Sequence, residues 1–406
     1  MAPADRTASP PVRRTDAELG ADAVALAVDL VRIDSVNPGL VPWAAGEHDV
    51  VHLLRDRLQH SGFQTHLVTP PGHDDRPSLV AIGPQGSHGF TIVLTGHVDT
   101  VGVEGMADPF AARVDDDRLL GRGASDMKAG VAGLVVAAEE LVARGAAGRV
   151  VLALVADEED AGLGTEAVLE ALPGLGIVAD VAVVGEPTWL ALAETLRGYA
   201  LVEVTLTGRA AHSSQPELGT NAVTHLGRLL SAVEARDRAL PHAGGSLMVT
   251  VAQGGESPFV LAQRARALVE RRTVAGESSD DAVAEVEGIV ADLGRDDPTV
   301  AAAVRLVVAR EPWRLDDDGP AATLGAHLER ALAADGPLDG THEGRFQAPY
   351  WMEAPLWQAA GIPALVCGPA GGGLHAADEW VDLRQVRRYA AGVTAAVEAW
   401  VVDGAD

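Results

Sequence analysis

Four apolar stretches of the sequence end next to side chains that can bind metal ions. TIVLTG runs into HVDT, VLALVA into DEED, and VAVVG into EPT, while PALVCGP is followed by glycines and a histidine. A fifth segment, GRGASDMKAG, carries one further acid ahead of an apolar stretch. The candidate ligands in these segments are His97, Asp99, Asp126, Glu186, His375 and the acids at 157–160.

This set combines two imidazoles with at least three carboxylates. Such a mixture of nitrogen and oxygen ligands suits Zn²⁺ or a similar first-row divalent ion. The set is too large for one tetrahedral zinc site, which takes four ligands. Two ions that share a bridging carboxylate fit the number of ligands better. The residues therefore predict a site for two divalent metal ions.

Two features of these segments have more than one interpretation. Runs of acids recur at 115–117 and 316–318, so the run at 157–160 can be a solvated turn rather than a site. Its position after a strand-like stretch favours a role for some of the four acids. Lys128 is the single lysine of the chain and follows Asp126 by two residues. Either an ammonium group is needed there or its presence is chance.

Strand-like and helix-like patterns alternate along most of the chain, which predicts an α/β fold built on a mainly parallel sheet. In such a sheet ligands bind just beyond the carboxyl ends of the strands, where these candidate ligands lie. The strands are expected at 78–83, 91–96, 150–156, 181–187 and 362–369. The helices are expected at 23–33, 129–145, 323–334, 354–361 and 384–401.

A different pattern occupies the middle of the chain. It predicts a smaller α+β sandwich in βαββαβ order, inserted into the larger domain. Its strands are expected at 199–208, 246–253, 264–273 and 300–308, and its helices at 219–237 and 279–293. The predicted domains are a flexible tail at 1–16, a metal-binding domain at 17–197 and 312–406, and the insertion at 198–311.

Length and charge limit the class of protein. A chain of 406 residues is long enough for two domains, and its net charge of -27 argues against nucleic acid or an anionic membrane as a partner. No apolar run reaches the roughly 20 residues that a membrane-spanning helix needs. The amino terminus lacks the apolar region of a secretory signal, and the single cysteine, Cys367, resembles a small buried apolar residue. We therefore expect a cytoplasmic protein with a small-molecule or short peptide substrate.

With these residues assembled, the chain resembles the M20 family of metallopeptidases and amidohydrolases. The resemblance covers nearly everything after the tail and is carried by spaced blocks in family order. They are TGHVDTV at 95–101, GRGASDMKAG at 121–130, ADEEDAGLGT at 156–165, GEPT at 185–188, AHSSQPELGTNAV at 211–223 and GGGLHAADEWVDL at 371–383. GEPT is more similar to the acetylornithine deacetylase and desuccinylase branch than to the carboxypeptidases.

The resemblance implies a role for each matched residue. Asp126 would bridge the two metals, with His97 and Glu186 on one and Glu159 and His375 on the other. Asp99 would orient His97 through its second ring nitrogen, as groups hydrogen-bonded to a metal-binding histidine commonly do. Glu158 would be the general base, while Asp157 and Asp160 would form a solvated turn.

Further matches lie in the insertion. His212 would stabilise the oxyanion, and Arg272 would grip a substrate carboxylate through its planar guanidinium group. Asn221 matches a motif position, either as a substrate contact or as a helix start. In the family this domain mediates dimerisation, so a homodimer is implied.

The activity implied is hydrolysis of the amide bond of an N-acyl amino acid, with Zn²⁺ as the expected ion and Co²⁺ as the alternative. A dipeptidase or carboxypeptidase is the first alternative, and a non-catalytic ligand-binding relative is a minor one. The sequence departs from the family at Phe259 and Ala262, where an Asn and a Pro are usual, and at Glu353, where many relatives have Asp. These departures concern the substrate more than the reaction.

Overall fold

The computed structural model describes residues 13–86, 89–145, 148–241, 244–342 and 344–403, which form two compact units. The first unit holds the described residues up to Ala193, then Leu315–Phe346 and those from Met352 onward. The second unit holds Glu194–Arg314 and Gln347–Trp351, so the predicted insertion at 198–311 falls inside it. Each unit is described separately below.

The start of the first unit corrects the prediction of a flexible tail at 1–16. Residues 1–12 lie outside the described residues, but Thr15 accepts a hydrogen bond from the Glu18 backbone and caps the first helix. Arg14 forms ion pairs with Asp22 and with the almost fully buried Glu140. The pair with Glu140 holds this segment to the unit, because Glu140 lies on α3, 126 residues away in the sequence.

A six-stranded sheet in the order β1-β2-β6-β3-β7-β15 lies at the centre of the first unit. From β6 to β15 the neighbours are parallel, while β1 and β2 pair antiparallel at one edge. The apolar runs form strands buried on both faces, as a covered parallel sheet requires. The strands are β1 Gln64–Val68, β2 Ser78–Ile82, β3 Thr91–His97, β6 Arg149–Val155, β7 Val181–Val184 and β15 Ala364–Val366.

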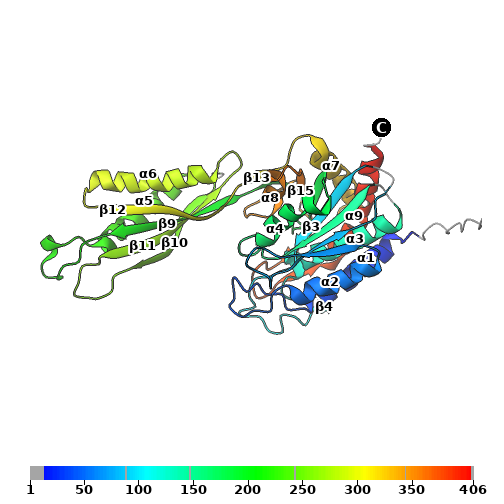
Figure 1. The fold of residues 1–406 in the computed structure, drawn as a ribbon, viewed down its shortest axis with the longest axis horizontal. Coiled ribbons are helices and arrows are strands. Elements are labelled where there is room, and N and C mark those ends of the chain that lie inside the picture. The colour runs from blue at the N-terminus through cyan, green and yellow to red at the C-terminus, as the bar shows by residue number, and fades with distance from the viewer. Residues whose placement is uncertain (1–12, 87–88, 146–147, 242–243, 343, 404–406) are drawn as a thin grey trace, which may run out of the picture. The chain divides into compact units, whose positions relative to one another are not determined.

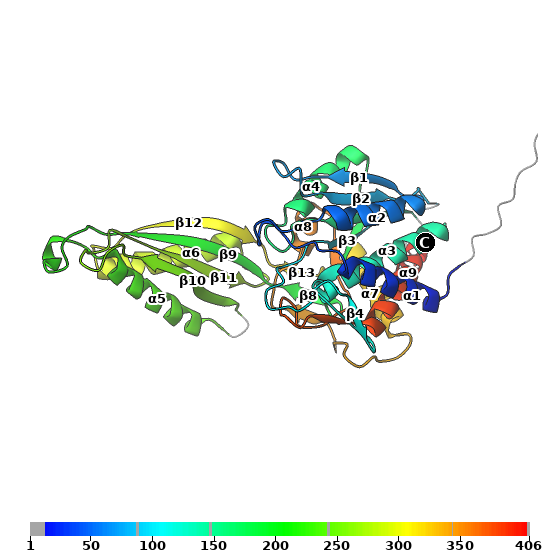
Figure 2. The same cartoon turned by 90° about the horizontal axis from the view of Figure 1, so that it is seen from below.

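Helices cover this sheet. α1, α3 and α9 pack against one another, and α3 also contacts β3 and β6 (Figure 1). α2 and α4 lie beside β1 and β2 (Figure 2), and α7 and α8 contact β15 (Figure 1). α3 is apolar except for Glu139 and Glu140 and is buried along nearly its whole length, as expected for an internal helix. The helices are α1 Asp16–Val31, α2 His48–His60, α3 Ala129–Ala143, α4 Leu163–Ala171, α7 Gly319–Ala333, α8 Ala354–Ala359 and α9 Leu383–Asp403.

A small antiparallel sheet in the order β16-β17-β5-β4 positions two of the metal-ligand segments. β16 and β17 form a hairpin whose connection contains His375. β5 leads into the turn Ala124–Lys128, which contains Asp126 and precedes α3. The strands are β4 Arg113–Asp115, β5 Arg118–Leu120, β16 Gly371–Gly372 and β17 Trp380–Asp382.

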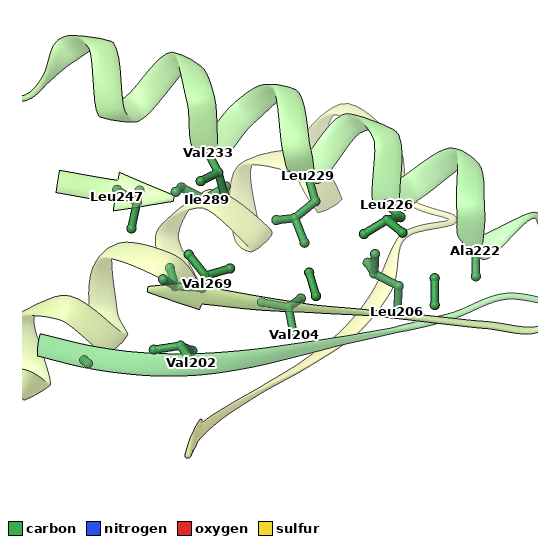
Figure 3. Packing of buried hydrophobic residues seen from close by; sticks show 14 of the residues in the cluster. Val202, Val204, Leu206, Ala222, Leu226, Leu229, Val233, Leu247, Val269 and Ile289 are labelled. Carbon is green, nitrogen blue, oxygen red and sulfur yellow. The ribbon is translucent and has the colours of Figure 1, made fainter. Parts of the chain in front are cut away.

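The core of the second unit has the predicted βαββαβ order. Its antiparallel sheet runs β10-β11-β9-β12, and buried side chains alternate along β9 and β11. Figure 3 shows Val202, Val204 and Leu206 of β9 beneath Leu229 of α5, with Ile289 of α6 in the same core. The elements are β9 Gly198–Thr207, α5 Ala222–Ala239, β10 Ser246–Gly254, β11 Arg264–Thr273, α6 Ser279–Asp296 and β12 Ala301–Arg310.

The remaining described strands form a three-stranded sheet in the order β13-β8-β14. They are β8 Ala193–Leu196, β13 Trp313–Arg314 and β14 Phe346–Ala348. Among the described residues no helix combines the length and the apolar character needed to cross a membrane.

Candidate dinuclear metal site

The parallel order of the strands brings three of the predicted ligand segments to one edge of the central sheet. His97 is the last residue of β3, and β3 lies between β6 and β7. Glu158 and Glu159 follow β6, and Glu186 follows β7. Because parallel strands end at the same edge, a histidine is flanked on both sides by carboxylates.

Asp126 faces both predicted histidines. Its Oδ1 lies 3.2 Å from Nε2 of His97, and its Oδ2 lies 3.2 Å from Nε2 of His375. Nε2 of His375 is also 3.0 Å from Oε2 of Glu159. The two oxygens of one carboxylate therefore point to two different imidazoles, as in a group that bridges two ions.

The remaining two glutamates lie on the His97 side. Nε2 of His97 is 3.7 Å from Oε1 of Glu186 and 3.9 Å from Oε2 of Glu158. Two sets of side chains have all their ligand atoms within 4.8 Å of one another: His97, Asp126 and Glu159, and His97, Glu158 and Glu186. All the predicted ligands and the predicted base thus come together.

The carboxylates and imidazoles of this cluster shift one another's pKa values. Burial and the carboxylate of Glu186 raise the pKa of Glu158 well above its usual range, although His97 acts against them. Burial opposes a charge on His97, but nearby carboxylates outweigh it and raise the pKa of the ring well above its usual value. Hydrogen bonds to Asp126 and Glu159 raise the pKa of His375 to about 10. Carboxylates therefore dominate the electrostatics of the cluster, because they outweigh the effect of burial on His97.

The donor set fits divalent metal ions. Oε1 of Glu159 is buried, and no hydrogen bond reaches it among the residues that the structure describes. A buried carboxylate oxygen without a partner is costly, and a cation removes that cost. Two imidazoles and the carboxylates of Asp126, Glu159 and Glu186 supply the nitrogen and oxygen ligands that zinc and cobalt accept. The residues present therefore fit the metal ions inferred from the sequence.

Asp99 supports the cluster through its backbone and through its side chain. Nδ1 of His97 lies 3.0 Å from the backbone carbonyl oxygen of Asp99 and 3.5 Å from its carboxylate. The carboxylate itself accepts hydrogen bonds from the backbone N–H groups of Glu158 and Glu159, at 3.1 and 3.2 Å. Asp99 therefore orients His97 mainly through its backbone, and its side chain fixes the turn that carries two acids of the site.

Asp157 corrects the prediction of a solvated turn. Its side chain is buried, whereas Asp160 is exposed as predicted. Nδ2 of Asn37 donates to Asp157 and to Asp99, at 3.2 and 2.8 Å, and the guanidinium of Arg76 lies 3.0 Å from Asp157. The backbone of Asp157 has a φ of 67°, in the left-handed region that bulky residues rarely adopt. The structure thus places Asp157 behind the turn, as the anchor of Glu158 and Glu159.

Lys128 and Glu353, which the sequence analysis also singled out, are both buried and hydrogen-bonded. Lys128 is fully buried, and its Nζ donates to the carbonyl oxygens of Leu30 and Ile33, at 3.0 and 2.7 Å, near the end of α1. These bonds suit a compact ammonium group. Glu353 is fully buried, accepts a hydrogen bond from Thr165, and its charge contributes to the raised pKa of Glu158.

The predicted residues of the second unit have their own contacts. Nδ1 of His212 accepts a hydrogen bond from the Ser214 backbone at 3.2 Å, so a neutral ring carries its proton on Nε2. Asn221 is the N-cap of α5, and its Oδ1 accepts from Val223. The guanidinium of Arg272 bonds to Glu270 and lies 5.3 Å from the ring centre of Tyr199.

Phe259 and Ala262, the departures from the family pattern, lie beside the His212 segment. The backbone of Val260 pairs with that of His212, and the carbonyl oxygen of Phe259 accepts a hydrogen bond from Ser213. Phe259 is 67% exposed. A large apolar side chain is therefore available next to a predicted catalytic residue.

The chain is similar to known proteins in both sequence and fold. The model of peptidase family M20/M25/M40 matches residues 93–399. Succinyl-diaminopimelate desuccinylase of Dinoroseobacter shibae is 31% identical, over 90% of this chain and 95% of that protein. Acetylornithine deacetylase of Myxococcus xanthus is 31% identical, over 86% and 91%. A Bacillus subtilis protein described as a dinuclear metal binding peptidase from the M20 family has a similar fold, with a TM-score of 0.70, 16% identity, and coverage of 95% and 98%.

Proposed function

The chain belongs to peptidase family M20/M25/M40, a family of amide-bond hydrolases, and we propose that it removes the acyl group from an N-acyl amino acid with two divalent metal ions. The observation that carries the proposal is the position of Asp126, whose two oxygens each lie 3.2 Å from a different imidazole. Glu158 lies in the same cluster, within 3.9 Å of His97, where a general base is needed.

We assign the metal ligands by the predicted grouping, with His97 and Glu186 on one side of Asp126 and Glu159 and His375 on the other. The contacts of Glu159 with His375 and of Glu186 with His97 support this grouping. Zn²⁺ is the ion we propose, with Co²⁺ as the alternative. When bound, two such ions polarise the amide carbonyl and make the attacking water more acidic.

The protein groups carry the proton transfers. Glu158 would accept the proton of the water during attack and pass it to the leaving amine. Burial among other carboxylates raises the pKa of Glu158, which suits a group that must hold a proton between the two steps. The turn that carries Glu158 is fixed by Asp99, so the base has a defined position.

The second unit would supply the remaining contacts. His212 would donate from Nε2 to the oxyanion, which agrees with the acceptance of the Ser214 backbone hydrogen bond at Nδ1. Arg272 would bind the substrate carboxylate, and Asn221 would contribute a contact in addition to capping α5. We also propose a homodimer formed through this unit, because its edge strand β12 exposes Leu306 and Val307. The cytoplasmic location stays a prediction.

Turnover of defined substrates by the zinc-loaded protein tests the proposal. N-acetylornithine, N-succinyl-diaminopimelate and a panel of dipeptides would be compared, with Glu158→Gln as the control for contaminating activity. Hydrolysis of an acyl amino acid that Glu158→Gln lacks is the expected result. Cleavage of dipeptides alone would favour the peptidase alternative, which the fold of the Bacillus subtilis peptidase supports. Absence of bound divalent metal in the purified protein would refute the metal centre.

A further inference from the structure

Arg122 and Glu379 form a buried ion pair between two ligand segments that are distant in the sequence. Nη1 of Arg122 lies 2.6 Å from Oε2 of Glu379, and the side chains are 3% and 1% exposed. Arg122 precedes Asp126 by four residues, and Glu379 follows His375 by four. The pair therefore joins the segments that contain the bridging carboxylate and one imidazole of the site.

Glu379 holds the backbone of the turn that contains Asp126. Its Oε1 accepts hydrogen bonds from the N–H groups of Ser125 and Asp126, at 2.9 and 3.1 Å. Its Oε2 accepts from the N–H of Gly123 at 2.9 Å, in addition to Arg122. One carboxylate thus accepts three backbone hydrogen bonds from this single turn, which fixes where the turn places Asp126.

Arg122 also donates to two backbone carbonyl groups, one of them in a third segment. Its Nε donates to the carbonyl oxygen of Gly102 at 3.0 Å, in the segment that follows His97 and Asp99. Its Nη2 donates to the carbonyl oxygen of Ala376 at 3.2 Å, directly after His375. A guanidinium group can make these bonds in one plane because its five N–H donors have a fixed geometry.

A separate hydrogen bond joins the same two segments. Oγ of Ser125 accepts from the backbone N–H of Gly371, at 3.2 Å, at the start of the hairpin that contains His375. The Asp126 turn and the His375 hairpin are therefore connected at more than one point. Their relative position is set by buried side chains rather than by the exposed side chain of His375, which is 54% accessible.

We propose that Arg122 and Glu379 are positioning residues that set the metal affinity of the site by fixing Asp126 relative to His97 and His375. The inference rests on the metal centre of the proposed function, and it concerns the affinity for the ions rather than the substrate. Groups that hold metal ligands in place alter metal affinity when they are replaced, by about 10- to 100-fold.

Glu379→Gln tests the carboxylate with little change in shape. A carboxamide has one acceptor oxygen, whereas both oxygens of Glu379 accept hydrogen bonds. In either orientation its NH₂ group meets N–H donors, which pushes the turn away from its position. We therefore expect zinc to bind at least one site about 10- to 100-fold more weakly.

Glu139→Gln is the matched control. Glu139 is also a buried carboxylate that accepts two hydrogen bonds from an arginine, Arg57, and one from Ser61. It is the eleventh residue of α3, which starts at Ala129, so it lies roughly 15 Å along the helix from the ligand turn. Its replacement removes a comparable buried charge without touching a ligand segment.

The measurement is competition for Zn²⁺ between each metal-free protein and a chromophoric chelator, with circular dichroism to show that the protein is folded. Weaker zinc binding by Glu379→Gln, with wild-type affinity in Glu139→Gln, supports the proposal. Wild-type affinity in folded Glu379→Gln overturns it. A wild-type protein that binds no Zn²⁺ would instead refute the proposed function.

Arg122→Lys provides the test if Glu379→Gln does not fold. Lysine keeps the charge beside Glu379 but cannot reproduce the planar set of bonds to Gly102 and Ala376. We expect its zinc affinity to fall by about 10-fold, and wild-type affinity in the folded variant would overturn the proposal. Co²⁺ absorption spectra of Arg122→Lys should also change, because the ligand geometry shifts, whereas a purely structural role would leave them unaltered.

Discussion

Replacing Arg76 tests whether a buried charge network stabilises the turn behind the metal site. Its Nε lies 2.7 Å from Oε2 of Glu47, and its guanidinium also lies 3.0 Å from Asp157. The side chains of Arg76, Glu47 and Asp157 are 7%, 0% and 2% exposed. Arg76→Ala would therefore leave two carboxylates buried without this partner.

The expected loss of stability follows from that burial. Removing one partner of a buried ion pair costs about 3–5 kcal/mol, because the remaining charge stays desolvated. At about 2–4 °C per kcal/mol for a unit of this size, the melting temperature of the first unit should fall by about 6–20 °C. Burial already raises the pKa of Glu47 although Arg76 lowers it, so Glu47 can take up a proton when Arg76 is removed, which favours the lower part of this range.

Scanning calorimetry with excess chelator measures this effect without a contribution from metal binding, and it can separate the transitions of the two units. Arg55→Ala is the matched control, because Arg55 pairs with the exposed Asp56 and such a pair contributes at most about 1 kcal/mol. If Arg76→Ala cost no more than Arg55→Ala, Arg76 would not compensate the buried acids, and the reasoning about the network would be wrong.

Three other predictions concern the metal site and the second unit. Glu158→Gln should lower turnover by about 10²- to 10⁴-fold with unchanged zinc content, measured by elemental analysis, whereas Glu159→Ala should bind one ion fewer. Removal of zinc that is present at about 100 times its dissociation constant should cost about 2.7 kcal/mol and lower the transition of the first unit alone in calorimetry. Leu229→Ala should destabilise the second unit by about 2–5 kcal/mol without changing zinc content, since Leu229 is fully buried in that unit's core.

The sequence predicted most elements because their patterns are local. The order of the second unit follows from alternating apolar residues in its strands and from the helical spacing of residues such as Leu226, Leu229 and Val233. The sequence predicts a start of α5 near 219, three residues before its observed start at Ala222, where Asn221 is the N-cap. The ligands were found because strand ends are recognisable in a sequence and because their segments match the family.

The supporting residues were not predicted, since their partners lie far away in the sequence. In the sequence Asp157 is one acid among four. In the structure it accepts a hydrogen bond from Asn37 and pairs with Arg76, which lie 120 and 81 residues away in the sequence. Glu379 and Arg122 stand inside two of the matched blocks, but nothing in either block shows that they meet. Pairing of this kind is set by the tertiary structure, which a single sequence does not reveal.

The path of the chain through the first unit has a consequence for protein synthesis. α9 packs against α1, α3 and α7, and β15 pairs with β7, so α1 and α3 lack one helix neighbour and β7 lacks its outer strand until the carboxyl-terminal segment exists. Between Ala193 and Asp403 the ribosome must add 210 residues, which takes roughly 10–40 s at about 5–20 residues per second. During that interval α1 and α3 lack the contact with α9, while the strands and helices from β9 to β12 are complete once Arg310 has been added. The helix layer of the first unit is therefore completed only by the last helix to be synthesised.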